Sequence, residues 1–163
     1  MKLTSNFKKR EGFTLIEMFV VIAVIGILAG IVLQGTSGFQ SKARDTRRIG
    51  DLKNTQNYLE LYYNKCGHYP GKADCNDTSN PSNWSELVTA LNDSKVTNAK
   101  IPTDPVPGRN YIYSVKSIDR LEYILGAVLE NDNKILKDGL TENPTGFSPS
   151  VTCTDTLTYC FRS

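Results

Sequence analysis

The feature that most constrains this chain is an apolar run from Phe13 to Leu33, in which Glu17 is the single charged residue. A helix needs about 20 apolar residues to cross the hydrocarbon core of a bilayer. A helix at the surface of a soluble protein would show an apolar stripe with a period of 3.6 residues, whereas this run is apolar on every side. The sequence therefore predicts a membrane-inserted helix.

Glu17 is the exception within this run. A carboxylate near the middle of a membrane costs about 2.5–3.5 kcal/mol on insertion scales. The surrounding Leu, Ile, Val and Phe side chains contribute about −0.3 to −0.6 kcal/mol each, which together outweigh that cost. An ionisable residue in such a segment is a candidate functional residue, and it needs a partner of opposite charge.

The flanking charges predict an orientation. Lys8, Lys9 and Arg10 directly precede the apolar run, and residues 1–12 hold four of the 19 basic residues but one of the 17 acidic residues. Basic residues next to a membrane helix favour the cytoplasmic side, so we expect a cytoplasmic N-terminus. A secretory signal peptide fits less well because its cleavage site follows the apolar region, whereas here the small residue Gly12 precedes it.

The segment KKREG-FTLIEMFVVIAVIGILAGIV strongly resembles the processing and methylation signal of type IV pilins and type II secretion pseudopilins. The resemblance implies that prepilin peptidase cuts between Gly12 and Phe13 and that Phe13 is N-methylated. It also implies that Glu17 meets the amine of a neighbouring Phe13 during assembly. A buried carboxylate needs a cation, and a mature N-terminus supplies one.

The same resemblance implies a pilin-like α+β fold and a homo-oligomer in a helical filament. The precursor would be a single-pass protein of the bacterial cytoplasmic membrane, with its head outside the cytoplasm and the filament in the periplasm or at the cell surface. An inner-membrane assembly platform and the lipid bilayer are the other implied partners. The alternative is a lone signal-anchored binding or adhesive domain that neither polymerises nor needs Glu17.

One departure from the family concerns proline. Many pilins carry a proline in the middle of this helix, and this segment has none. The stretch from Phe13 to Gly38 contains instead four glycines, Gly26, Gly30, Gly35 and Gly38, each of which weakens a helix by about 1 kcal/mol relative to alanine. Gly26 and Gly30 also have the spacing of a surface that packs closely on another helix.

Residues 41–64 predict a soluble continuation of the helix, with one apolar stripe facing a core. The stripe comprises Ile49, Leu52, Leu59 and Tyr63, with Gln56 between them. The polar side chains expected to face water are Asp45, Arg48, Asp51, Lys53 and Glu60. The predicted organisation is a leader at 1–12, a membrane and assembly half at 13–40, an amphipathic half at 41–64, and a head at 65–163.

In the head, the sequence predicts a loop over 66–81 and a short helix over 84–91, with Ser82 as its cap. Strand patterns cover 111–115 and 121–129, and Lys134 to Leu136 continue the pairing. Gly126 inside the second strand indicates a bulge. Tyr159 and Phe161 around Cys160 indicate a final edge strand or a pinned loop. The result is a small antiparallel sheet packed against the long helix.

Two head motifs extend the resemblance toward the major pseudopilins. They are YYNKCGHYP at 62–70 and the Asp-Pro segment IPTDPVPGRNYIYS at 101–114. The tail after Glu142 has no counterpart that we can match.

The chain contains four cysteines, in two sequence-local pairs. Four cysteines allow three connectivities, and we favour the local pairs Cys66/Cys75 and Cys153/Cys160. The alternative is free buried thiols in a cytosolic protein, which an export signal disfavours. The small formal net charge of +2 gives no indication of nucleic-acid binding.

Neither a cofactor nor catalysis is predicted. The resembled branch often binds calcium near the C-terminus, and the nearest oxygen-rich residues here are Asp132, Asn133 and Asp138. Their spacing does not follow the EF-hand loop, so we interpret them as solvated turn residues, with calcium as the alternative. His68 is the one histidine, and neither a nucleophile elbow nor a phosphate loop is present. We therefore expect a substrate of processing enzymes rather than an enzyme.

Overall fold

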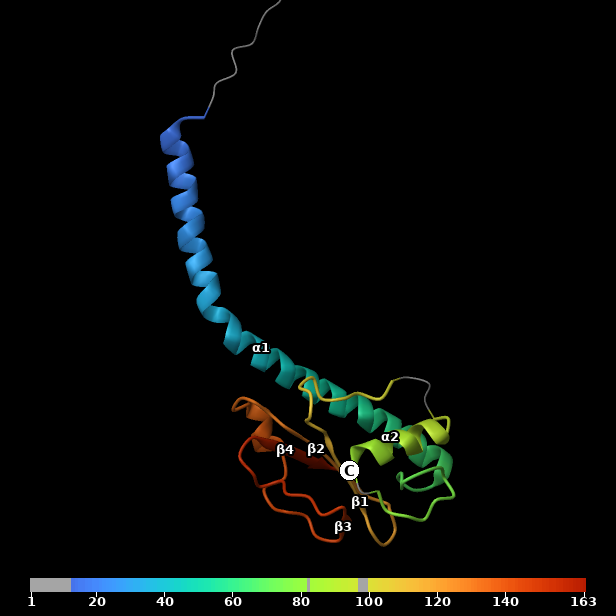
Figure 1. Cartoon of the computed structure of the whole chain (residues 1–163). Coiled ribbons are helices and arrows are strands. Elements are labelled where there is room, and N and C mark those ends of the chain that lie inside the picture. Colours follow the sequence, from blue (N-terminus) through green and yellow to red (C-terminus); the bar gives the residue numbers. More distant parts are fainter. Residues whose placement is uncertain (1–12, 82, 97–99) are drawn as a thin grey trace, which may run out of the picture. The chain divides into compact units, whose positions relative to one another are not determined.

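The computed structural model describes residues 13–81, 83–96 and 100–163, with the side chains of 32–37 excepted. These residues form two compact units, one up to Phe39 and one from Gln40 to Ser163, each of which is described by itself. Helix α1, Leu15–Cys66, contributes to both (Figure 1). The predicted long helix is therefore confirmed.

Helix α1 ends at Cys66 because of the glycine that follows it. Gly67 has a φ of +77°, and its N–H donates to the carbonyl oxygen of Tyr63 at 2.8 Å. Glycine adopts this left-handed conformation without steric cost, and it commonly terminates helices in this way.

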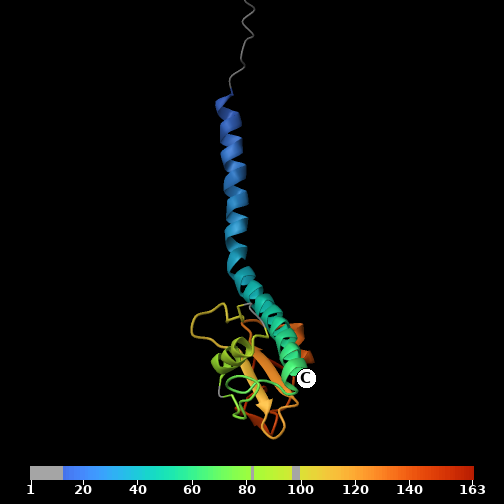
Figure 2. The ribbon, with the colours of Figure 1, turned by 90° about the vertical axis from the view of Figure 1, so that its right-hand side faces the viewer.

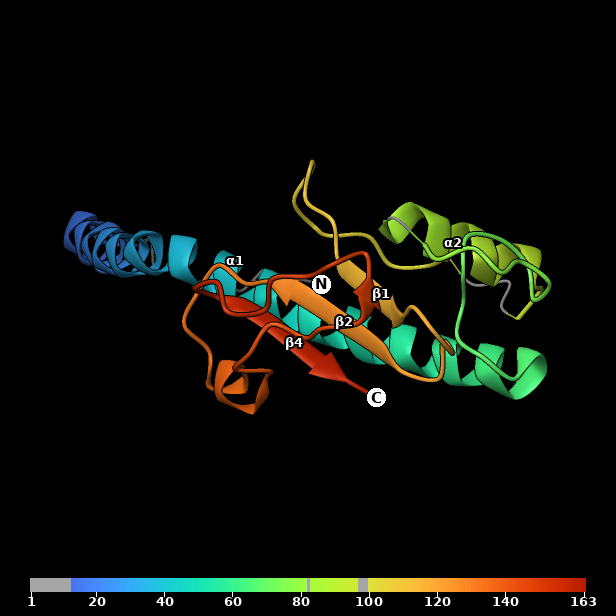
Figure 3. The same cartoon turned by 90° about the horizontal axis from the view of Figure 1, so that it is seen from below.

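The second unit contains a four-stranded antiparallel sheet. Its strands are β1 (Ile112–Lys116), β2 (Tyr123–Val128), β3 (Phe147–Ser148) and β4 (Thr158–Arg162), in the order β3-β1-β2-β4. The two predicted central strands and the edge strand around Cys160 are present, whereas the short strand β3 was not predicted. The strands and helix α2, Trp84–Asp93, gather around the part of α1 that follows Gln40 (Figures 2 and 3).

The core of this unit lies between α1, α2 and the sheet. Helix α1 contributes Leu52, Leu59 and Tyr62, which are at most 1% exposed. Its partners include Leu87 and Leu91 of α2 and Tyr113, Val115, Tyr123 and Leu125 of the sheet. The predicted α+β arrangement, with a long helix on a small antiparallel sheet, is confirmed.

Three predictions about local structure in the head were wrong, and they concern residues 134–136, Ser82 and Gly126. Lys134 to Leu136 do not extend a strand but lie in a 3₁₀ helix, η1, Lys134–Asp138. The side-chain oxygen of Asn133 accepts the N–H of Ile135 at 3.1 Å, and such a local hydrogen bond competes with sheet pairing. Helix α2 is capped by Asn83, whose side-chain oxygen accepts the N–H of Glu86 at 3.1 Å. Ser82, the predicted cap, lies outside the described residues.

Gly126 does not form a bulge. It keeps continuous register with Ile112 on one side and Cys160 on the other. A Cβ at this position would lie 2.8 Å from the carbonyl oxygen of Tyr159 and 3.0 Å from the sulfur of Cys160. The glycine therefore permits a close approach of β4 rather than an extra residue.

Candidate functional site

The first unit exposes an almost continuous apolar surface. Phe13, Leu15 and Ile16 are 85%, 75% and 70% exposed. The other large apolar side chains exposed along this unit are Met18, Phe19, Val20, Val21, Ile22, Val24, Ile25, Ile27, Leu28, Ile31 and Phe39. A surface of this kind marks a site of contact with a membrane or with other protein chains.

Glu17 is the one acidic residue of this surface among the described residues. Together with Ile16, Val20 and Val21 of α1, and with Phe13 just before the helix, it lines a shallow hollow. The carboxylate itself is exposed in the single chain, and its neighbours along the surface are apolar side chains.

Thr14 and Glu17 form a reciprocal cap at the start of α1. The N–H and the hydroxyl of Thr14 donate to Oε2 of Glu17 at 2.8 Å and 2.7 Å. The N–H of Glu17 donates in turn to the hydroxyl of Thr14 at 3.4 Å. This is the capping-box arrangement, and the Thr-x-x-Glu spacing is its sequence signature. Our sequence reasoning missed this role of Thr14.

Gly12 and the basic leader residues Lys8, Lys9 and Arg10 lie outside the described residues, whereas Phe13 directly precedes the cap. Within the described part of the chain, no helix meets both the length and the hydrophobicity that crossing a membrane requires.

In the second unit, α1 carries a buried group of charges, the Arg48 cluster, formed by Arg44, Asp45, Arg48, Asp104 and Glu130. Arg48 and Asp45 are 0% and 1% exposed, so the expectation that they face water was wrong. The guanidinium of Arg48 donates to both oxygens of Asp104 at 2.7 Å and 3.0 Å. Its Nη1 also donates to Asp45 and to Glu130, at 2.8 Å each.

The Arg48 cluster ties α1 to two distant segments. Asp45 accepts the N–H groups of Glu130 and Asn131 at 2.9 Å and 3.0 Å, and the side-chain amide of Asn131 at 2.7 Å. Arg44 forms a two-pronged ion pair with Glu130. An amphipathic pattern cannot reveal this burial because Arg44 and Arg48 find their partners Asp104 and Glu130 more than 50 residues away.

The electrostatic consequences follow from these contacts. Hydrogen bonds from Arg44 and Arg48 lower the pKa of Glu130 to about 2, although burial opposes them. Burial raises the pKa of Asp104, but the hydrogen bonds from Arg48 and from the N–H of Val106 outweigh it, so the net shift is downward. Each carboxylate of the Arg48 cluster is paired with an arginine, so the contacts of the cluster are those of a structural ion-pair network.

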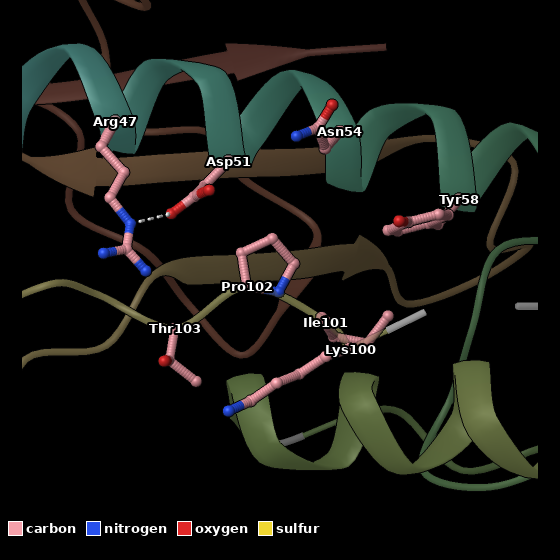
Figure 4. A pocket seen from close by; sticks show the side chains of 8 residues that line it. All are labelled: Arg47, Asp51, Asn54, Tyr58, Lys100, Ile101, Pro102 and Thr103. Atoms are coloured by element: carbon pink, nitrogen blue, oxygen red, sulfur yellow. Dashed lines mark ion pairs between the residues drawn. The ribbon is translucent and has the colours of Figure 1, made fainter. Parts of the chain in front are cut away.

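A polar groove lies along the same unit, between α1 and residues 100–103 (Figure 4). Arg47 and Asp51 line it, and they form an ion pair at 3.6 Å. The hydroxyl of Tyr111 also donates to Asp51 at 2.7 Å. Asp51, the acidic residue of the groove, is therefore already bound to the side chains of Arg47 and Tyr111.

The structure joins the cysteines as Cys66–Cys75 and Cys153–Cys160. His68 lies in the first disulfide loop, and its two ring nitrogens lie 3.0 Å from the carbonyl oxygens of Tyr69 and Cys75. Its ring is held by backbone groups, with no acid or nucleophile among these contacts.

The three weak calcium candidates, Asp132, Asn133 and Asp138, lie in or directly before η1. Asp132 and Asp138 are exposed, and Asn133 uses its side-chain oxygen to cap η1. In the parts of the chain that the structure describes, no group of three or more His, Cys, Asp or Glu residues is arranged to hold a metal ion.

Comparison with known proteins identifies the N-terminal segment. Residues 7–33 match the prokaryotic N-terminal methylation motif. The type II secretion system core proteins G of Escherichia coli K12 and Aeromonas hydrophila are 39% and 35% identical over 62 and 63 residues. These alignments cover 38% and 39% of this chain, and 43% and 44% of those proteins.

Fimbrial protein Q of Moraxella bovis is 51% identical over 43 residues, which are 26% of this chain and 27% of that protein. The chain thus spans less than half the length of these curated relatives. No solved structure matches it significantly. The resemblance found in the sequence is confirmed: the chain carries a prokaryotic N-terminal methylation motif and is similar, over that part of its length, to type II secretion core protein G and to the type IV major alpha-pilin of Moraxella bovis.

Proposed function

We propose that this protein is a structural subunit of a type IV pilus or a type II secretion pseudopilus. Residues 1–12 are the leader, and prepilin peptidase cuts between Gly12 and Phe13 and methylates Phe13. Residues 13–40 serve membrane attachment and assembly, 41–64 form the amphipathic half of the helix, and 65–163 form the head. The protein is a substrate of processing enzymes and has no catalytic role of its own.

The observation that carries this proposal is the combination of the methylation motif with the exposed apolar surface around Glu17. Side chains such as Phe13 and Ile16 are stable in lipid or against sister helices, and costly in water. Cleavage after Gly12 creates an amine at Phe13, and a neighbouring chain can bring that amine to Glu17. The pairing neutralises a carboxylate that hydrocarbon surrounds.

The proposal includes location and partners. Before assembly, the precursor is held at the cytoplasmic membrane through its apolar N-terminal segment, with the N-terminus inside and the head outside. An inner-membrane platform then adds the subunit to a homo-oligomeric helical filament in the periplasm or at the surface. A lone anchored domain is the alternative, and it uses neither the cleavage site nor Glu17.

Glu17→Gln tests the pairing. The amide keeps the size of the side chain but cannot neutralise an amine, so we expect filament yield to fall at least about tenfold while membrane attachment is unchanged. Sheared filaments and membrane fractions from the native host are quantified by immunoblot, and the N-terminus is read by mass spectrometry.

Glu142→Gln is the matched control, because Glu142 is exposed in the head, outside the apolar segment. It should leave filament yield unchanged. Wild-type yield from Glu17→Gln would refute the charge pairing. A wild-type chain that retains residues 1–12 would refute processing and favour the lone anchor.

A further inference from the structure

Three Asn-x-Ser/Thr triplets without a central proline occur in the head. They begin at Asn76, Asn83 and Asn92. This triplet is the acceptor pattern for N-linked glycosylation, which requires an accessible surface position in an exported protein. The structure distinguishes sharply among the three.

Two of the triplets are built into α2. The side-chain oxygen of Asn83 caps the helix, and the Trp84 that follows it is 5% exposed. Asn92 lies in the last turn, and Ser94 of its triplet is 5% exposed, with its hydroxyl donating to the carbonyl oxygen of Leu91 at 3.0 Å. Neither triplet can enter an enzyme without unravelling α2.

The Asn76 triplet has the opposite character. Asn76 and Thr78 are both exposed, and among the described residues neither side chain forms a hydrogen bond. The intervening Asp77 accepts the N–H groups of Lys72, Ala73 and Ser79 at 2.8–2.9 Å. The backbone is thus fixed by Asp77, while the acceptor amide and the hydroxyl are left to solvent.

A turn displays Asn76. The N–H of Asn76 donates to Oδ1 of Asp74 at 3.0 Å, and the N–H of Asp77 donates to the carbonyl oxygen of Asp74 at 3.1 Å. The adjacent residue, Cys75, is bonded to Cys66, which closes the loop onto the end of α1. Disulfides persist in oxidising compartments, so this loop belongs on the extracytoplasmic side, where lipid-linked glycans are transferred.

From this geometry we infer that Asn76 is a glycosylation site, the acceptor of an oligosaccharide carried on a lipid diphosphate. The amide nitrogen of Asn76 attacks the anomeric carbon of the sugar and forms an N-glycosidic bond. The bond from that carbon to the diphosphate oxygen breaks, the lipid diphosphate leaves, and the amide gives one proton to a base of the transferase. The inference rests only on export of the head, as in the proposed function, and not on polymerisation.

The test is mass spectrometry of the full chain isolated from its native host. Cleavage at Lys72 and Lys95 yields one peptide that contains all three triplets, so electron-transfer fragmentation must locate the added mass. We expect a saccharide mass on Asn76, complete loss of it in Asn76→Gln and Thr78→Ala, and retention in Thr78→Ser. Asn92→Gln is the control and should keep the modification.

An unmodified Asn76 in the host-derived chain would overturn the inference, as would a glycan that persists in Asn76→Gln or resides on Asn83 or Asn92. The intact disulfide between Cys66 and Cys75 in each variant shows that the loop is still folded. The N-terminal peptide of the same sample reports processing after Gly12, so failure of the glycan site and failure of the proposed function are read separately.

Discussion

Arg48 shows what a sequence pattern cannot reveal at the scale of single residues. Its charge predicts exposure, yet it shares a helix face with Leu52, four residues further on, and it is fully buried with three carboxylates around it. Burying a guanidinium is costly unless its donors are all engaged. The compensating Asp104 and Glu130 come from segments 56 and 82 residues away, so only the folded chain brings them together. In contrast, Phe13 and Glu17 were recognised because their motif is local.

Replacing Arg48 should strongly destabilise the head. Arg48→Met leaves Asp45 and Asp104 buried without their cation, and breaking one partner of a buried ion pair typically costs about 3–5 kcal/mol. We expect a corresponding fall in the free energy of unfolding, measured by urea titration of the detergent-solubilised chain. The fluorescence of Trp84, the one tryptophan and a core residue, reports on the head.

Arg47→Met is the matched control, because Arg47 directly precedes Arg48 on α1 and its side chain is 60% exposed. Its ion pair with Asp51 is long, and exposed pairs contribute about 0–1 kcal/mol. Equal effects of the two substitutions would contradict the structural role assigned to Arg48.

Glu130 gives the head an acid-dependent stability. Its pKa in the folded chain is about 2, below its ordinary value of 4.5, because Arg44 and Arg48 favour the charged form. A depressed folded pKa contributes stability that is fully present above the unfolded pKa and is lost as the pH falls through the folded pKa. The urea midpoint should therefore fall between about pH 4.5 and 2. Glu130→Gln should have a lower midpoint at pH 7 and a shallower decline, and an unchanged slope would refute the assignment.

At the scale of elements, the sequence correctly predicted the helix and the strands that have a recognisable residue pattern. Helix α1 and the strands β1 and β2 have long, regular patterns, and Gly67 supplies a recognisable stop. The wrong predictions concern positions where a local polar contact or a tertiary contact determines the secondary structure. Asn133 turns the chain into η1, and Gly126 is required by the nearness of Tyr159 rather than by a bulge. Strand β3 has two residues, too few to form a pattern, and it exists because β1 offers an edge.

At the scale of the whole molecule, the two units differ in how much apolar surface they expose. Apart from Ile118, Leu121, Val128 and Leu61, the large apolar side chains that the structure describes as exposed all lie between Phe13 and Phe39. The second unit encloses its own core, the Arg48 cluster and both disulfides. The apolar surface that lipid or sister chains would cover therefore lies on the first unit.

Removing that unit should leave a folded, water-soluble head. We expect a chain that begins at Gln40 to be monomeric without detergent in light scattering coupled to size exclusion, because the apolar surface that requires cover is gone. The full-length chain should associate or precipitate under the same conditions. The head should keep the Trp84 fluorescence and cooperative urea transition of the full chain in detergent, since its core residues all follow Gln40. An aggregated head, or one without a cooperative transition, would mean that residues before Gln40 are needed for folding as well as for assembly.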